Sequence, residues 1–148
     1  MLDFLIIVNI TIMAAVYGYA VAASAIAYPA MMASSRATAV DYFAPFFHKS
    51  AHMQLVLALV VLGLSLVISL MGGGWLWFIG AFVLQLSGPY TIKVLMPVNN
   101  RIMAQDADIH SEKMTNDLSS WGRLHFPRTV LATHVFILFA YLAVKGGV

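Results

Sequence analysis

The residues best suited to chemistry lie together at the start of the last apolar segment, between positions 121 and 129. Trp121, His125 and Arg128 stand at i, i+4 and i+7, so on a helix an indole, an imidazole and a guanidinium share one face. Imidazole can act as a general base near neutral pH, and a guanidinium can stabilise an oxyanion. Because such groups are costly in lipid, this face is a candidate functional site. The alternative is that Trp121 and Arg123 belong to an ordinary interface belt.

A second candidate is the histidine pair His48 and His52, one helical turn apart near the start of the second apolar segment. Their rings can share a helix face, and together with His125 they could bind a metal ion or haem. The alternative is that both are interfacial histidines in contact with water and lipid headgroups. The set lacks the carboxylates that are typical of di-iron bundles.

Composition places the chain among integral membrane proteins. Of its 148 residues, 61% are hydrophobic and 9% are charged, far from the charge content of a soluble domain. The formal net charge is +2 and the bases are not clustered with aromatics, so nucleic acid is not an expected partner. With no cysteine, a disulfide, a thiolate nucleophile and an iron–sulfur cluster are excluded.

Four apolar segments are each long enough to cross a bilayer as a helix. They cover about residues 4–27, 51–71, 75–96 and 127–145. The pattern predicts a single all-α domain, an up-down-up-down four-helix membrane bundle. Gly72-Gly73-Gly74 predicts a tight turn between the second and third helices.

The remaining segments are polar. Residues 30–44 and 102–120 are predicted as connectors, with the second helix beginning at Pro45 and Pro97 ending the third. The carboxylates of the second connector, Asp106, Asp108 and Asp117 among them, are predicted as a solvated face. Pro89 is predicted to bend the third helix. Trp75 and Trp77 are predicted as an aromatic belt.

Two faces of the first segment differ in character. Ala14, Gly18 and Ala22 recur every four residues, a spacing that lets a neighbouring helix approach closely, including one from a second copy of the chain. Tyr17, Ser24 and Tyr28 lie on another face and could line a cavity. For Ser24, a hydrogen bond to a backbone carbonyl of a neighbouring residue is the expected arrangement.

Basic residues are distributed unevenly between the two ends of this bundle. The connector side carries Arg36, Lys49, Lys93, Arg101, Lys113, Arg123 and Arg128, whereas the terminal side carries Lys145 alone. The positive-inside rule then predicts cytoplasmic connectors and termini outside, in a bacterial inner or plasma membrane. The candidate polar residues converge at the cytoplasmic end: Tyr28, His48, His52, Tyr90, Lys93, Asn99, Trp121, His125 and Arg128.

Three stretches also resemble the anthrone oxygenase-like family. They are Pro89-Tyr90-Thr91, then Met96-Pro97-Val98-Asn99-Asn100-Arg101-Ile102, and Trp121-Gly122-Arg123-Leu124-His125-Phe126-Pro127-Arg128-Thr129. Tyr28-Pro29-Ala30 fits the family's small-aromatic-proline element. The resemblance implies a four-helix membrane unit. Members that act in polyketide pathways oxidise anthrones to anthraquinones with molecular oxygen, without an evident bound cofactor. The resemblance implies functional roles for Asn99, Trp121, His125 and Arg128. His48 and His52 lie outside the shared pattern.

The leading hypothesis is a membrane oxidoreductase or oxygenase for a lipophilic aromatic or quinone-like molecule that enters from the bilayer. His125 acts as general base, and Arg128 with Lys93 stabilises the enolate or phenolate. Trp121 and Tyr90 stack on or hydrogen-bond the ring, and Asn99 and Tyr28 complete the binding site. No cofactor is expected.

Two other hypotheses stay open at this stage. One is the metal or haem site built from His48, His52 and His125. The other is a non-enzymatic accessory subunit or small-molecule carrier, which assembles through the small-residue face of the first helix.

Overall fold

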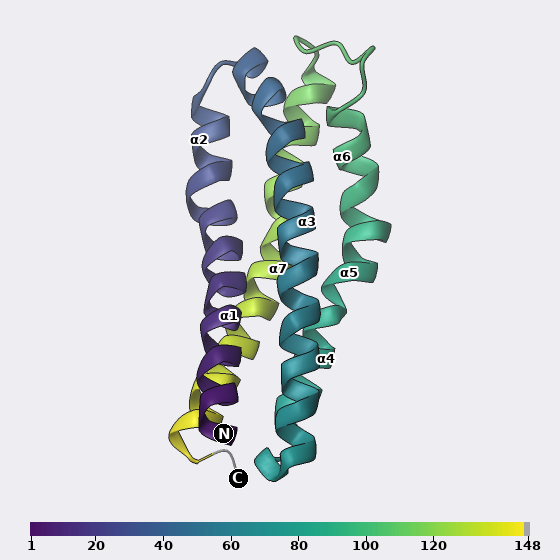
Figure 1. The fold of residues 1–148 in the computed structure, drawn as a ribbon. Coiled ribbons are helices and arrows are strands. Elements are labelled where there is room, and N and C mark those ends of the chain that lie inside the picture. Colours follow the sequence, from purple (N-terminus) through teal and green to yellow (C-terminus); the bar gives the residue numbers. More distant parts are fainter. Residues whose placement is uncertain (147–148) are drawn as a thin grey trace.

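Four helical stretches run along a common axis in the computed structural model, which describes residues 1–146 (Figure 1). The first two stretches are α1 (Leu2–Ala22), a π-helical turn (Ala23–Ala27) and α2 (Tyr28–Ala33), followed by α3 (Arg36–Ile68) with a π-helical turn (Ser69–Gly73). The last two are α4 (Leu76–Gln85), α5 (Ser87–Tyr90), a π-helical turn (Thr91–Leu95) and α6 (Met96–Ile102), followed by α7 (Glu112–Val144).

All four stretches are long and apolar enough to cross a membrane. The predicted all-α, four-helix membrane fold is confirmed. In the half of the bundle that holds the chain's N-terminus, α1 packs against α3 and α7, and α4 packs against the same two helices. We call this half, which includes the turn at Gly72–Gly74, the terminal half. The other half carries the connectors at 34–35 and 103–111 and is called the connector half (Figure 1).

The turn between the second and third stretches depends on glycine. Gly72 and Gly74 have φ angles of 91° and 87°, in the left-handed region that other residues rarely adopt. The predicted glycine turn is therefore present.

The first connector is much shorter than the sequence predicted. Residues 30–44 are helical except at Ser34 and Ser35, so the second helix begins at Arg36 and Pro45 lies inside it. Ser35 caps this helix, because its Oγ accepts a hydrogen bond from the Thr38 backbone N–H at 3.2 Å. The polar residues of this segment form helical turns, although their polarity had suggested a loop.

The second connector is also shorter, and spans residues 103–111. The third stretch continues past Pro97 to Ile102. The fourth begins at Glu112, where Ser111 Oγ accepts from the Met114 N–H at 3.2 Å, and runs through Pro127 without interruption.

Pro97, which was expected to end a helix, instead follows a π-helical turn, and so does Pro29. Pro29 and Pro97 each come two residues after such a turn. A proline ring clashes with the carbonyl four residues earlier, here that of Ala25 or Lys93, which is the middle residue of the turn in each case. The wider π-helical turn relieves that clash, so the helix continues.

Pro89 has a different effect. The third stretch is interrupted at Leu86, between α4 and α5, three residues before Pro89, in agreement with the predicted bend. The lower segment, α4, packs against α3, whereas α5 and α6 diverge from α3, and the π-helical turn Thr91–Leu95 and α6 pack against α7 (Figure 1). This divergence leaves room between α3 and the upper part of the third stretch.

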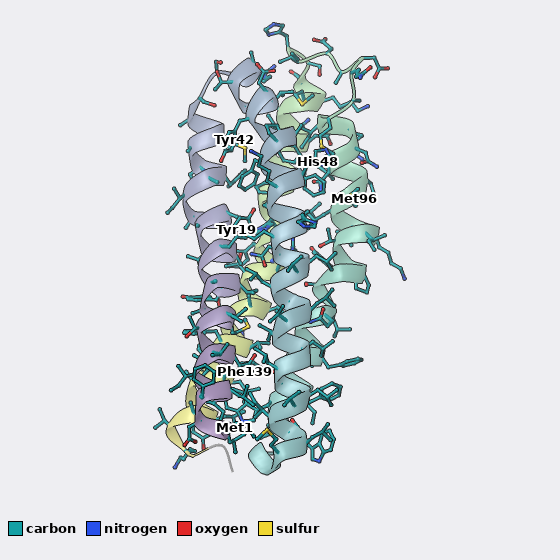
Figure 2. All side chains as sticks on the ribbon, viewed as in Figure 1. Met1, Tyr19, Tyr42, His48, Met96 and Phe139 are labelled. Carbon is teal, nitrogen blue, oxygen red and sulfur yellow. The ribbon has the colours of Figure 1, made fainter. Side chains whose placement is uncertain are left out.

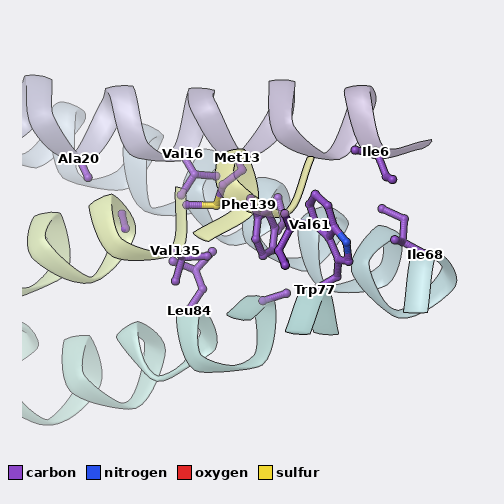
Figure 3. Close-up of a cluster of buried hydrophobic side chains, with 13 residues drawn as sticks. Ile6, Met13, Val16, Ala20, Val61, Ile68, Trp77, Leu84, Val135 and Phe139 are labelled. Carbon is purple, nitrogen blue, oxygen red and sulfur yellow. The ribbon is translucent and has the colours of Figure 1, made fainter. Parts of the chain in front are cut away.

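The terminal half holds the larger hydrophobic core, around Met13, Val61, Trp77 and Phe139 (Figure 3). Trp77 is 0% exposed, and its ring centroid lies 4.8 Å from that of Phe139. The prediction of an interfacial Trp77 is therefore wrong. Two residues apart on a helix, Trp75 and Trp77 face different directions, and only Trp75 is exposed.

The connector half is fixed by a second apolar cluster and by one ion pair. The cluster includes Phe43, Leu95 and Trp121. Asp117 is 8% exposed and binds Arg101, with a 2.6 Å contact from Nη2 to Oδ1 and a 3.0 Å contact from Nε to Oδ2. The solvated role predicted for Asp117 is wrong, because its carboxylate ties α7 to α6.

The small-residue face of α1 has no neighbour within the described residues at its centre. A Cβ added at Gly18 would meet no atom within 4 Å. Association of two copies through Ala14, Gly18 and Ala22 stays a prediction.

Candidate functional site

A cavity of about 480 Å³ lies in the space left by the divergence of α5 and α6 from α3. Its size falls in the range of small-molecule sites. Residues from all four stretches line it, and two of them, Tyr19 and Met96, mark its level in the connector half (Figure 2). Much of the wall is aromatic or aliphatic, including Phe46, Phe47, Leu55, Leu95 and Trp121. Such a wall suits a flat apolar molecule.

The polar part of the wall includes His125 and Arg128 from α7 and Asn99 from α6. Of the described residues that line the cavity, Arg128 is the single lysine or arginine, and none is an aspartate or glutamate. The cavity therefore has a cation without a compensating carboxylate.

His125 is held from two sides. It is 4% exposed, and its ring stacks on Trp121 with centroids 5.0 Å apart and planes at 27°. Its Nδ1 lies 2.9 Å from Ser24 Oγ, which lies 2.8 Å from Thr129 Oγ1. Thr129 Oγ1 in turn donates to the Ala20 carbonyl at 2.9 Å. Within residues 1–146 the other ring nitrogen, Nε2, makes no hydrogen bond, and it is the nitrogen left for a ligand.

Arg128 and Asn99 carry buried groups without partners. In the described part of the chain, Arg128 Nε and Asn99 Oδ1 have no hydrogen-bond partner. By contrast, the amide nitrogens of Gln54 and Gln85 donate to the Val16 and Ala58 carbonyls, at 3.3 and 3.0 Å. Unsatisfied buried polar groups are costly, so a ligand that bonds Arg128 and Asn99 would remove that cost.

The predicted site residues separate into three groups. Trp121, Asn99, His125 and Arg128 line the cavity. Tyr90 and Tyr28 support it from behind: the Tyr90 hydroxyl donates to the Leu124 carbonyl at 2.8 Å, and the Tyr28 ring lies 6.2 Å from that of Trp121. Lys93 is exposed and does not line the cavity, so the structure does not bring it to Arg128.

His48 and His52 are exposed and do not line the cavity either (His48 in Figure 2). Among the described residues, no group of three or more His, Cys, Asp or Glu side chains is arranged to hold a metal ion. The residues do not fit a metal or haem bound jointly by His48, His52 and the buried His125. His134 is also exposed.

The hydrogen-bonded series from His125 through Ser24 to Thr129 was not predicted from the sequence. Ser24 was expected to bond a nearby backbone carbonyl, but its hydroxyl contacts α7 instead. Thr129 lies four residues after His125, so the sequence spacing alone places both side chains on one helix face. The partner of Ser24 depends on how α1 packs against α7, which no local pattern specifies.

One side of the cavity reaches the outer surface of the bundle. The lining residues Ala51 and Leu55 of α3, with Gly88 and Ile92 of the third stretch, are exposed, Leu55 by 58% and Ile92 by 69%. We call these four residues the lateral rim.

Comparison with known families identifies the family of the chain. The family model described as anthrone oxygenase matches residues 43–138. The chain belongs to the anthrone oxygenase family. The matched segment contains Tyr90, Asn99 and the Trp121–Arg128 face, whereas Ser24 and Tyr28 precede it. No curated protein and no solved structure matches the chain.

Proposed function

We propose that the protein is a membrane-embedded oxygenase for a lipophilic aromatic or quinone-like molecule, with anthrones as the first substrates to test. The observation that carries the proposal is the pairing of two groups in one largely apolar cavity: among residues 1–146, His125 Nε2 has no hydrogen-bond partner and Arg128 has no counter-ion. Such a pair suits the removal of a proton from carbon when the resulting negative charge moves to an oxygen atom. The base takes the proton, and the cation stabilises the charged oxygen.

The roles of the side chains follow from their chemistry. His125 Nε2 accepts a proton from the activated methylene, and Arg128 binds the oxygen on which the negative charge develops. Trp121 stacks on the aromatic ring system, and Asn99 Oδ1 accepts a hydrogen bond from a substrate hydroxyl. Lys93 has no part in this arrangement because it lies outside the cavity.

The overall reaction converts a methylene to a carbonyl. Loss of one proton gives a carbanion that adds molecular oxygen, and the resulting hydroperoxide loses water. The balance is one CH₂ group and one O₂ giving one C=O group and one H₂O. The chain's residues supply the first proton transfer and hold the enolate, and the substrate itself supplies the electrons.

The lateral rim supports entry of the substrate from the bilayer. A molecule dissolved in the hydrocarbon can pass between Leu55 and Ile92 into the cavity without crossing a polar connector. The excess of Lys and Arg at the connector end supports cytoplasmic connectors and termini outside. Membrane lipid is then the immediate surrounding of the rim.

The test is oxygen consumption and anthraquinone formation by protein purified in detergent and supplied with anthrone or 1,8-dihydroxyanthrone. We expect protein-dependent turnover above the spontaneous rate, with equal amounts of oxygen consumed and quinone formed. Arg128→Gln should lower kcat/KM by about 10²-fold or more, because it removes the charge that stabilises the anion. Tight binding of these molecules without turnover would refute the enzyme and favour a small-molecule carrier.

A further inference from the structure

Three short contacts link the His125 ring to the backbone of α1, and they run from Nδ1 through Ser24 and Thr129 to the Ala20 carbonyl. We propose that Ser24 and Thr129 act as positioning residues that hold neutral His125 in the Nδ1–H tautomer and leave Nε2 unprotonated toward the cavity. The tautomer itself does not depend on the reaction. Its catalytic consequence rests on the function proposed above.

A count of protons decides the tautomer. The three contacts, at 2.9, 2.8 and 2.9 Å, each need one hydrogen between the two heavy atoms. The Ala20 carbonyl can only accept, so the two hydroxyls supply at most two of the three hydrogens. If Nδ1 carried no proton, one contact would join two lone pairs. With a proton on Nδ1, the direction of donation is the same along the whole series, and every contact is satisfied.

The fold places each member of this series where the next can reach it. Thr129 follows His125 by one turn of α7, and Ala20 precedes Ser24 by one turn of the first stretch. Ser24 lies in the π-helical turn Ala23–Ala27, which we attributed above to Pro29. Thr129 is 9% exposed and Ser24 is half-buried, so bulk water competes little for these bonds.

This arrangement suits a base that gains and loses a proton repeatedly. When Nε2 accepts a proton, Nδ1 keeps its own, so the same three hydrogen bonds persist in the imidazolium form. No hydroxyl has to rotate during the transfer. In the opposite tautomer Nε2 would carry a proton and could not accept one from the substrate.

The experiment is ¹⁵N NMR of the full chain labelled with ¹⁵N-histidine, recorded in detergent at a pH where histidine is neutral. His125 is assigned by the signal lost in His125→Gln. We expect a pyrrole-like shift for Nδ1 and a pyridine-like shift for Nε2. The reverse pattern in the wild type would overturn the proposal, whatever the protein's activity.

His134 provides an internal reference. Its Nδ1 lies 2.8 Å from the Val130 carbonyl, an acceptor only, so this ring must also carry its proton on Nδ1. Its signals, assigned with His134→Gln, should match the expected pattern and should not respond to changes at Thr129.

Thr129→Val removes the hydroxyl with little change of volume, and Thr129→Ser is the matched control because it keeps the hydroxyl. In Thr129→Val, Ser24 can donate to Nδ1, so the His125 signals should move toward a mixture of tautomers. Thr129→Ser should keep the wild-type pattern. Identical His125 spectra for all three proteins would refute the role of Thr129.

Turnover provides the second readout. Thr129→Val should lower kcat by about tenfold with little change in KM, since the base is misdirected while the binding wall is intact. Thr129→Ser should recover most of the loss. Loss of the tautomer preference without any change in kcat would show that the hydrogen-bonded series exists but that His125 is not the base.

Discussion

The ring of Tyr28 lies against the backbone of Gly122, in the space that a side chain at position 122 would occupy. A Cβ added at Gly122 would overlap the Tyr28 ring. This contact joins α2 to α7 one residue after Trp121, whose ring in turn stacks on His125. A glycine thus supports the histidine through two aromatic rings.

Gly122→Ala should therefore displace Tyr28 and disturb Trp121. We expect a lower apparent melting temperature in detergent, equivalent to about 1–3 kcal/mol, and reduced turnover, because overpacking forces side chains out of their preferred rotamers. Gly18→Ala is the matched control: its Cβ meets no atom within 4 Å of the described residues, so it should leave both quantities unchanged. Equal behaviour of the two variants would show that the Tyr28 contact is not needed.

The pair Arg101–Asp117 is expected to hold Asn99 at the cavity wall. Asp117→Asn removes the charge from a buried carboxylate, although Arg101 is partly exposed, with 42% of its side chain accessible. The expected loss of stability is about 1–2 kcal/mol, measured as a shift in thermal unfolding. Asp106→Asn, an exposed carboxylate of the same connector region, should have no effect. A comparable shift in both variants would assign the loss to net charge and not to this ion pair.

The sequence predicts those parts of the fold that depend on nearby residues, such as the apolar segments and the turn. Four apolar segments and a triglycine are enough to predict the four membrane helices and the turn. The connectors were predicted too long because polar residues were taken as loops, whereas Ser35 and Ser111 cap helices that extend past the apolar segments. Pro97 was expected to end a helix because proline disfavours α-helix, and the π-helical turn that accommodates it is not visible in hydropathy.

The site was predictable on α7 and less so elsewhere. The spacing of Trp121, His125 and Arg128 placed them on one face, and all three line the cavity. Lys93 stands only six residues before Asn99 yet faces outward, because six residues at about 100° each do not return a helix to the same face. The contact of Ser24 with His125 joins residues 101 positions apart and could not be found from spacing.

Arg128 and Asn99 should select ligands that carry hydroxyl or ionised oxygen substituents. Binding of 1,8-dihydroxyanthraquinone, followed by quenching of Trp121 fluorescence, should be at least about tenfold tighter than binding of unsubstituted anthraquinone. Arg128→Gln should reduce this preference, and Trp121→Phe serves to identify the quenched signal. An unchanged preference in Arg128→Gln would show that its guanidinium does not contact the ligand. His48→Ala and His52→Ala should not affect binding, since both side chains lie outside the cavity.

The lateral rim should admit neutral molecules from the bilayer faster than ions from water. The chain has no cysteine, so Ser50→Cys introduces a single thiol at the cavity wall. In lipid vesicles we expect it to react faster with methyl methanethiosulfonate than with the trimethylammonium-ethyl analogue, after correction for their rates with a free thiol. Adding Gly88→Leu should slow the neutral reagent several-fold, because a side chain then fills the rim. Gly18→Leu, on an open face away from the rim, is the control. Equal rates for the two reagents would mean that the cavity opens to water.

In the proposed reaction, His125 removes a proton from the substrate carbon. The most direct measurement is hydrogen–deuterium exchange at the methylene of anthrone, in D₂O without oxygen, so that proton transfer is observed apart from oxidation. The wild type should accelerate exchange above the spontaneous rate. His125→Gln should reduce the acceleration by about 10²-fold or more, and His134→Gln, which changes an exposed histidine on the same helix, should retain it. Acceleration that survives in His125→Gln would show that His125 is not the base and that another group removes the proton.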